Sequence, residues 1–150
     1  MMTGKDKLMN QKSLGQSMVE FALILPLMVL IVLGIFELGR AFFAYIAISN
    51  AAREGVRVYT FTPDTTTVNQ IYSTVVTEVG TSTLVDPDKI TSITIACGNA
   101  YTPVTTDAGL KACLVEEPIR VSVTYAHDLI LGILFSQPLT IGRSVEMMKP

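Results

Sequence analysis

Residues 21–36 form an apolar run without a single charge, and this run is the strongest hydrophobic signal in the chain. As a helix it would rise about 24 Å, while about 20 apolar residues are needed to cross a bilayer. The apolar pattern resumes at residues 41–48, and residues 49–59 contain no proline. We therefore predict one helix over about residues 16–58, whose first part spans a membrane.

Three residues modify this helix. Pro26 lies inside the apolar run and removes one backbone hydrogen bond, which predicts a local kink. Glu37 and Arg40 are three positions apart and share a helix face, so they can pair and partly cancel their charges. Alternatively, these two charges only lie at the interfacial end of the span, and the sequence leaves both interpretations open.

The second half of the chain shows one pattern of apolar residues that is typical of a helix and three that are typical of strands. Apolar residues recur every three or four positions over residues 68–79, which predicts an amphipathic helix ending at Gly80. Alternation of apolar and polar residues predicts strands at 93–97, 119–125 and 139–145. The expected fold class is α+β: a long N-terminal membrane-spanning helix packed against a small antiparallel β-sheet module with one short helix.

Two connecting segments carry further information. Pro63 breaks the long helix, and Asp64 or Thr65 would cap the helix that follows. The seven residues at 129–135 are apolar except for one glycine, and they are too few to span a bilayer. They either pack over the long helix or leave an exposed patch for a partner, and we favour packing.

Charge is scarce in this chain and unevenly placed. Charged residues make up 16% of the sequence, against about 25% in ordinary globular proteins. The segment before residue 16 carries a net charge of +2. Lys and Arg cluster on no element that would bind nucleic acid. The short segment before Gly15 cannot form a domain, so we expect the folded module to face outward.

The junction between the basic leader and the apolar run has a specific order. Gly15 is followed by Gln16, and Glu20 is the fifth residue after Gly15. A carboxylate at the start of an apolar membrane span costs free energy, so its presence indicates a functional role. This order resembles the processing site of type IV prepilin-like proteins. A secretory signal with a small-residue site at Ala44 and Ala47, and an uncleaved signal anchor, stay open as alternatives.

The segment at residues 51–57, after the apolar run, points to one family among the prepilin-like proteins. Taken with Gly15, Glu20 and Pro26, it resembles the TadE-like pseudopilins of tight-adherence (Flp) pilus systems. The most specific part of the resemblance is the set Ala52, Arg53, Gly55 and Arg57. Residues 119–147 fit the end of the family loosely. Phe21 is a departure, because the major pilins of these systems usually have Tyr after the glutamate, and this favours a minor subunit.

The resemblance implies a division of the chain. Residues 1–15 would be a prepilin-type leader, residues 16–59 a transmembrane and protruding helix, and residues 60–150 an extracytoplasmic α+β module. A prepilin peptidase would cut after Gly15. The new amine of Gln16 and the carboxylate of Glu20 would then help to seat the subunit among its neighbours.

The implied function is that of a minor pseudopilin-like subunit of a tight-adherence pilus or related secretion machine, acting in pilus assembly or adhesion. Its partners would be the prepilin peptidase, other pilins or pseudopilins, the assembly platform and the membrane. The protein would cross the cytoplasmic (inner) membrane once, with its C-terminal module outside, and it either joins a cell-surface pilus or only primes assembly. The alternative function is an uncleaved, membrane-anchored binding module.

The chain has two cysteines, Cys97 and Cys113, in a segment rich in turn-forming residues. In an oxidising outer compartment such a pair most simply forms a disulfide. Closing a loop of this length would contribute about 3 kcal/mol. Free thiols and a metal site are the alternatives, but a metal would need two more ligands and His127 is the single histidine.

We predict no catalytic residues and no cofactor. His127 and Asp128 are sequence neighbours at a strand end, where their side chains point in different directions. No serine or cysteine lies in a nucleophile motif. Arg53 and Arg57 share a helix face. They either lie at a solvated helix end or hydrogen-bond carboxylates or carbonyls of the sheet, with Gly55 leaving room for close packing.

Overall fold

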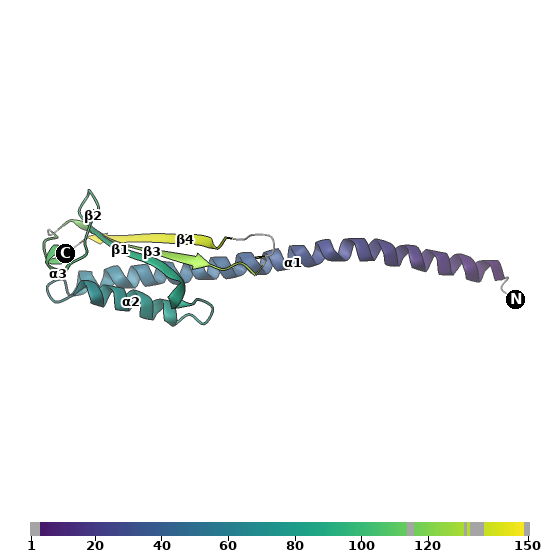
Figure 1. Ribbon diagram of the computed structural model, residues 1–150, viewed down its shortest axis with the longest axis horizontal. Helices are drawn as coiled ribbons and strands as arrows, with labels where there is room; N and C mark the ends of the chain where they lie inside the picture. The colour runs from purple at the N-terminus through teal and green to yellow at the C-terminus, as the bar shows by residue number, and fades with distance from the viewer. Residues whose placement is uncertain (1–3, 114–115, 131, 133–136, 149–150) are drawn as a thin grey trace. The chain divides into compact units, whose positions relative to one another are not determined.

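The computed structural model describes the backbone of residues 4–113, 116–130, 132 and 137–148, and the side chains of these from residue 15 (Figure 1). It divides into two compact units, residues 1–38 and 39–150. In chain order the elements are α1 (Gly4–Phe61), α2 (Val68–Gly80), the 3₁₀ turn η1 (Pro87–Lys89), β1 (Ile90–Cys97), β2 (Thr102–Pro103), α3 (Asp107–Lys111), β3 (Pro118–His127) and β4 (Leu139–Met148).

The first unit is the N-terminal part of α1. Its helix begins at Gly4, eleven residues before Gly15, and it continues through Pro26 without interruption. The apolar side chains between Phe21 and Phe36 are exposed, Leu23 to 75% for example. Within the described residues, α1 is the one helix long and apolar enough to cross a membrane. This agrees with the predicted span.

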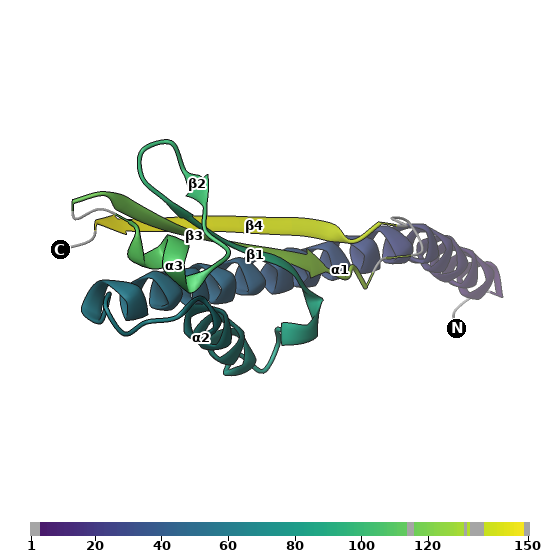
Figure 2. The same cartoon turned by 60° about the vertical axis from the view of Figure 1, so that its left-hand side comes forward.

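The second unit contains the rest of α1 together with the sheet and the shorter helices. All strand pairs are antiparallel, and the order across the sheet is β2-β1-β3-β4. Figures 1 and 2 both show β3 and β4 running alongside the C-terminal part of α1. The α+β fold class, the helix at 68–80 and the three predicted strands are therefore confirmed.

The core of this unit lies between α1, α2 and the sheet. From Ile119 onward the residues of β3 alternate between buried and partly exposed, with the buried side chains directed to the core and the others to the opposite face. The buried apolar residues of α1 recur along one face, as an amphipathic helix requires. From α1 the core takes Ala44, Ala47, Ile48, Ala51, Ala52, Val56 and Tyr59; from α2 Val68, Ile71, Val75 and Val79; and from β3 Ile119, Val121, Val123 and Tyr125.

The turn between α1 and α2 is built from threonines. The fully buried Thr66 donates from its hydroxyl to the carbonyl oxygen of Thr62 at 2.7 Å, which satisfies a carbonyl at the end of α1. The side chain of Thr67 caps α2 by accepting a hydrogen bond from the amide of Gln70 at 3.2 Å. The predicted caps, Asp64 and Thr65, are therefore wrong by two or three residues.

The prediction that residues 129–135 pack over the long helix falls mostly outside the described residues, which exclude 131 and 133–136. Of this segment, Ile130 is 61% exposed.

Candidate functional site

Gly55 lies at a close contact between α1 and the rest of the second unit. A β-carbon at this position would lie 2.7 Å from Cγ2 of Val75 in α2 and 3.6 Å from Cγ1 of Val121 in β3. Real β-carbons essentially never approach another atom so closely. Gly55 does permit close packing, but its nearest neighbour is the helix α2, where a strand or loop was predicted, and the strand β3 lies farther away.

Arg57 lies on the exposed side of the same helix. Its guanidinium donates to the Glu54 carboxylate at 3.1 Å and lies 5.3 Å above the centre of the Phe61 ring. Both partners belong to α1. The interpretation in which Arg57 hydrogen-bonds the sheet is thus wrong, because Glu54, one turn earlier, already supplies a carboxylate.

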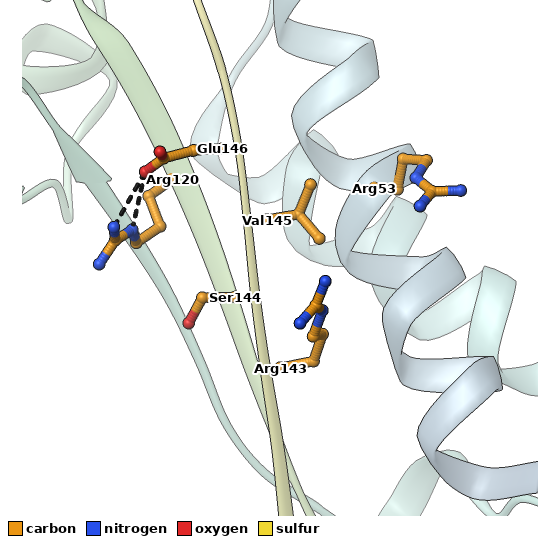
Figure 3. A pocket seen from close by; sticks show the side chains of 6 residues that line it. All are labelled: Arg53, Arg120, Arg143, Ser144, Val145 and Glu146. Atoms are coloured by element: carbon orange, nitrogen blue, oxygen red, sulfur yellow. Dashed lines mark hydrogen bonds and ion pairs between the residues drawn. The ribbon is translucent and has the colours of Figure 1, made fainter. Parts of the chain in front are cut away.

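Arg53 is placed differently, at an open pocket between α1 and strands β3 and β4 (Figure 3). The pocket has a volume of about 370 Å³ and is lined by Arg53, Arg120, Arg143, Ser144, Val145 and Glu146. Three guanidinium groups against one carboxylate give this lining a net charge of +2. The arrangement suits an anionic group, which charge-assisted hydrogen bonds from arginine bind well.

One of the three arginines is already paired. Arg120 donates to the Glu146 carboxylate at 2.9 Å, as the dashed lines in Figure 3 show, and its guanidinium stacks 3.5 Å from the centre of the Tyr101 ring. Sequence reasoning missed this pocket. The sequence pattern places Arg143 in the same alternating series as Leu139, Ile141 and Val145 of a weak strand, and nothing in its spacing connects it to Arg53.

The predicted processing residues lie at the N-terminal part of α1. Gly15, Gln16, Glu20 and Phe21 are all exposed. Glu20 makes no hydrogen bond or ion pair with any residue whose side chain the structure describes. Its carboxylate is therefore open to a partner outside this chain.

Arg40 and Asp128 connect the helix with the end of β3. The Arg40 guanidinium donates to the backbone carbonyl of Asp128 at 3.5 Å. The Asp128 carboxylate accepts from the Lys89 ammonium at 2.7 Å. This contact lowers the pKa of Asp128 and raises the pKa of Lys89, because each partner stabilises the charged form of the other. The predicted pair of Glu37 with Arg40 stays a prediction.

Comparison with known protein families identifies the N-terminal part of the chain. Residues 15–57 match the model of the family described as TadE-like protein. This segment is TadE-like. The match begins at Gly15, contains Glu20 and the whole apolar run, and ends at Arg57. Neither curated proteins nor solved structures gave a match to the chain.

The TadE-like segment contains every residue on which the resemblance was based in the first half of the chain. It associates the chain with Tad pili and with a membrane helix. The loose fit of residues 119–147 lies outside the matched range. The family match therefore gives no information about the sheet, or about the residues that line the pocket other than Arg53.

Beyond the TadE-like segment, Cys97 and Cys113 form the predicted disulfide, with their Cα atoms 6.0 Å apart. It closes the loop that carries β2 and α3. The same loop is tied to the helices at two further points: the Tyr59 hydroxyl donates to the carbonyl of Leu110 at 3.1 Å, and the amide of Val68 donates to the Asp107 carboxylate at 2.7 Å.

Replacing both cysteines, as in Cys97→Ala/Cys113→Ala, is expected to lower the free energy of unfolding by about 3 kcal/mol, because the open loop gains entropy in the unfolded chain. Membrane insertion should be unaffected. Thermal unfolding followed by circular dichroism measures the loss. Alkylation of both thiols in unreduced, denatured wild-type protein would contradict the disulfide itself.

Among the described residues, no group of three or more His, Cys, Asp or Glu side chains is close enough to hold a metal ion. The expectations that the protein has no metal, no cofactor and no catalytic residue stay predictions.

Proposed function

We propose that the protein is a minor pseudopilin-like subunit of a tight-adherence pilus or a related secretion machine. In this proposal residues 1–15 are a leader that a prepilin peptidase removes after Gly15. Residues 16–59 form the transmembrane and protruding helix, and residues 60–150 form the module outside the cytoplasmic (inner) membrane. The subunit acts through contacts with other pilins or pseudopilins and the assembly platform, in pilus assembly or adhesion, and not as an enzyme.

The observation that carries the proposal is the position of Glu20. It lies at the start of an apolar helix whose side chains are exposed, and its carboxylate has no partner among the described side chains. A carboxylate drawn into the hydrocarbon layer is costly unless it is paired. The amine that cleavage would create at Gln16 of a neighbouring subunit is a cation about 6 Å, or about one helical turn, from the depth of Glu20.

The test is the intact mass of the protein extracted from membranes of its native host. A processed subunit lacks the first 15 residues and begins at Gln16, whereas the alternative, an uncleaved membrane-anchored binding module, retains them. A mass that includes the leader in all of the protein would contradict the proposal.

Glu20→Gln is expected to abolish assembly while leaving cleavage and membrane insertion intact. Removing a charge from an apolar span makes insertion easier, so a defect would reflect the lost pairing. Co-purification with pilus-assembly partners measures the effect. Glu54→Gln, which removes a carboxylate of the same helix that is paired with Arg57, is the matched control and should assemble normally. Normal assembly of Glu20→Gln would exclude the pairing.

A further inference from the structure

β4 is a long, regular edge strand. It pairs with β3 through ten consecutive residue pairs without a bulge, from Leu139 opposite His127 to Met148 opposite Pro118. No other described strand lies on its far side. Edge strands in soluble proteins are usually short, bulged or interrupted by proline, because their free backbone groups can pair with another chain. β4 contains no proline and no bulge.

The pocket of Figure 3 opens at this edge. Arg143 and Val145 point from β4 towards α1, where Arg53 lies, while Ser144 and Glu146 point to the opposite face of the sheet. The pocket is therefore lined from both faces of β4. A molecule in it would lie beside the strand and not on one face of the sheet.

Two guanidinium groups at this edge are not paired with a carboxylate of any described residue. Glu146 is the one acid in the lining, and it pairs with Arg120. Within the described part of the chain, Arg53 has no ion pair, and the contact found for Arg143 is with the Tyr45 ring, 5.9 Å from its centre. Arg53 and Arg143 therefore present uncompensated positive charge beside a row of free backbone groups.

We propose that the free edge of β4 binds an extended acidic segment of a partner protein, which adds to the sheet as a fifth strand. Backbone hydrogen bonds to β4 hold the segment, and alternate side chains on a strand point to the same face. Carboxylates at alternate positions would therefore meet Arg53 and Arg143 on the side of α1. This inference does not depend on cleavage after Gly15.

The same features are compatible with the opposite role. A charged side chain on the inner face of an edge strand can also serve to prevent pairing with other chains. In that case Arg143 protects the edge and no strand is added. The two roles predict opposite results for binding of an acidic strand, so one experiment separates them.

The experiment measures binding of a fluorescein-labelled, ten-residue peptide of alternating Thr and Glu to the full-length protein in detergent micelles, by fluorescence anisotropy. Two further peptides serve as probes of mechanism: one with Gln in place of every Glu, and one with the same charge but N-methylated at alternate backbone amides. We expect the acidic peptide to bind at least about tenfold more tightly than either of them.

The variant Arg53→Gln/Arg143→Gln should weaken binding of the acidic peptide by about tenfold or more. Both side chains are exposed, so their replacement leaves the core unchanged, and circular dichroism checks the fold. Arg57→Gln is the matched control, because it removes an exposed arginine of the same helix that lies outside the pocket; its binding should equal that of the wild type.

Each failure overturns the proposal in a defined way. Equal binding of the N-methylated peptide would show that charge alone attracts the peptide and that no strand is added. Equal binding of the Gln peptide, or an effect of Arg57→Gln as large as that of the double variant, would show that Arg53 and Arg143 do not select the partner. No binding of any peptide would mean that the edge is protected.

Discussion

Gly55→Val is expected to lower the free energy of unfolding of the second unit by more than about 3 kcal/mol. The β-carbon alone would lie 2.7 Å from Val75 and the added methyl groups would need space that Ile71 and Val121 already fill. These neighbours are buried and β-branched, with restricted rotamers, so they cannot turn aside cheaply. The backbone of α1 would have to move away from α2 and β3. Thermal or denaturant unfolding, followed by circular dichroism in micelles, measures the loss.

Gly39→Val is the matched control, because no atom lies within 4 Å of a β-carbon built at Gly39 of the same helix. It should be neutral or slightly stabilising, since glycine is a poor helix former. A double-mutant cycle tests the contact directly: Gly55→Ala should cost less stability in a Val75→Ala background than in the wild type, because Val75→Ala removes the atom that clashes. Equal stability of Gly55→Val and Gly39→Val would contradict the close contact.

Gly15→Leu is expected to abolish processing and leave the full leader attached to the protein. The reason is steric: on the proposed function, the peptidase must bind residue 15 in a pocket without room for a branched side chain. Among the described residues nothing opposes the substitution, because none of their atoms lies within 4 Å of a β-carbon at Gly15 and leucine favours the helix. Intact mass spectrometry of the membrane-extracted variant measures the outcome.

Gly34→Leu controls for this experiment. Gly34 lies in the same apolar helix, and a β-carbon there also has no atom within 4 Å, but the position is far from the proposed cleavage site. This variant should be processed like the wild type. A mature N-terminus at Gln16 in Gly15→Leu would disprove the assigned cleavage position, whereas a leader retained in both variants would point to a general defect of the altered helix.

α2 and β3 were predicted from regular apolar patterns that correspond to a buried face, whereas β4 was predicted from a weaker alternation although none of its residues is buried. α2 and β3 have regular apolar patterns because each contacts the core along its whole length. The elements that were missed, β2, α3 and η1, are two, five and three residues long. A period cannot be recognised in so few residues. The helix cap at Thr67 was missed because several threonines and an aspartate in this turn could equally accept the hydrogen bond.

The candidate site was predictable only where it depends on local sequence. The close packing at Gly55 followed from a glycine within a helix that is otherwise well formed. The pair of Glu54 and Arg57 has a spacing of three residues, which places the two side chains on one helix face, but the sequence analysis weighed only a solvated helix end against hydrogen bonds to the sheet. The pocket joins Arg53 to Arg143, 90 residues later in the chain. Such a contact depends on strand register and on which strand lies at the edge, and neither is encoded in a local pattern.

β3 covers the core face of α1 but comes late in the sequence, and this has a consequence for how the protein is made. The core face of α1 is complete once Tyr59 has been synthesised, but β3, which covers it, ends only at His127. At ribosomal rates of about 5–20 residues per second, the intervening stretch takes roughly 3–14 s. During that time Ile48, Val56 and Tyr59 are without their final neighbours, and they are exposed to aggregation or to chaperones. Because β3 follows α1 by so many residues, the core face of α1 stays uncovered by β3 until late in synthesis.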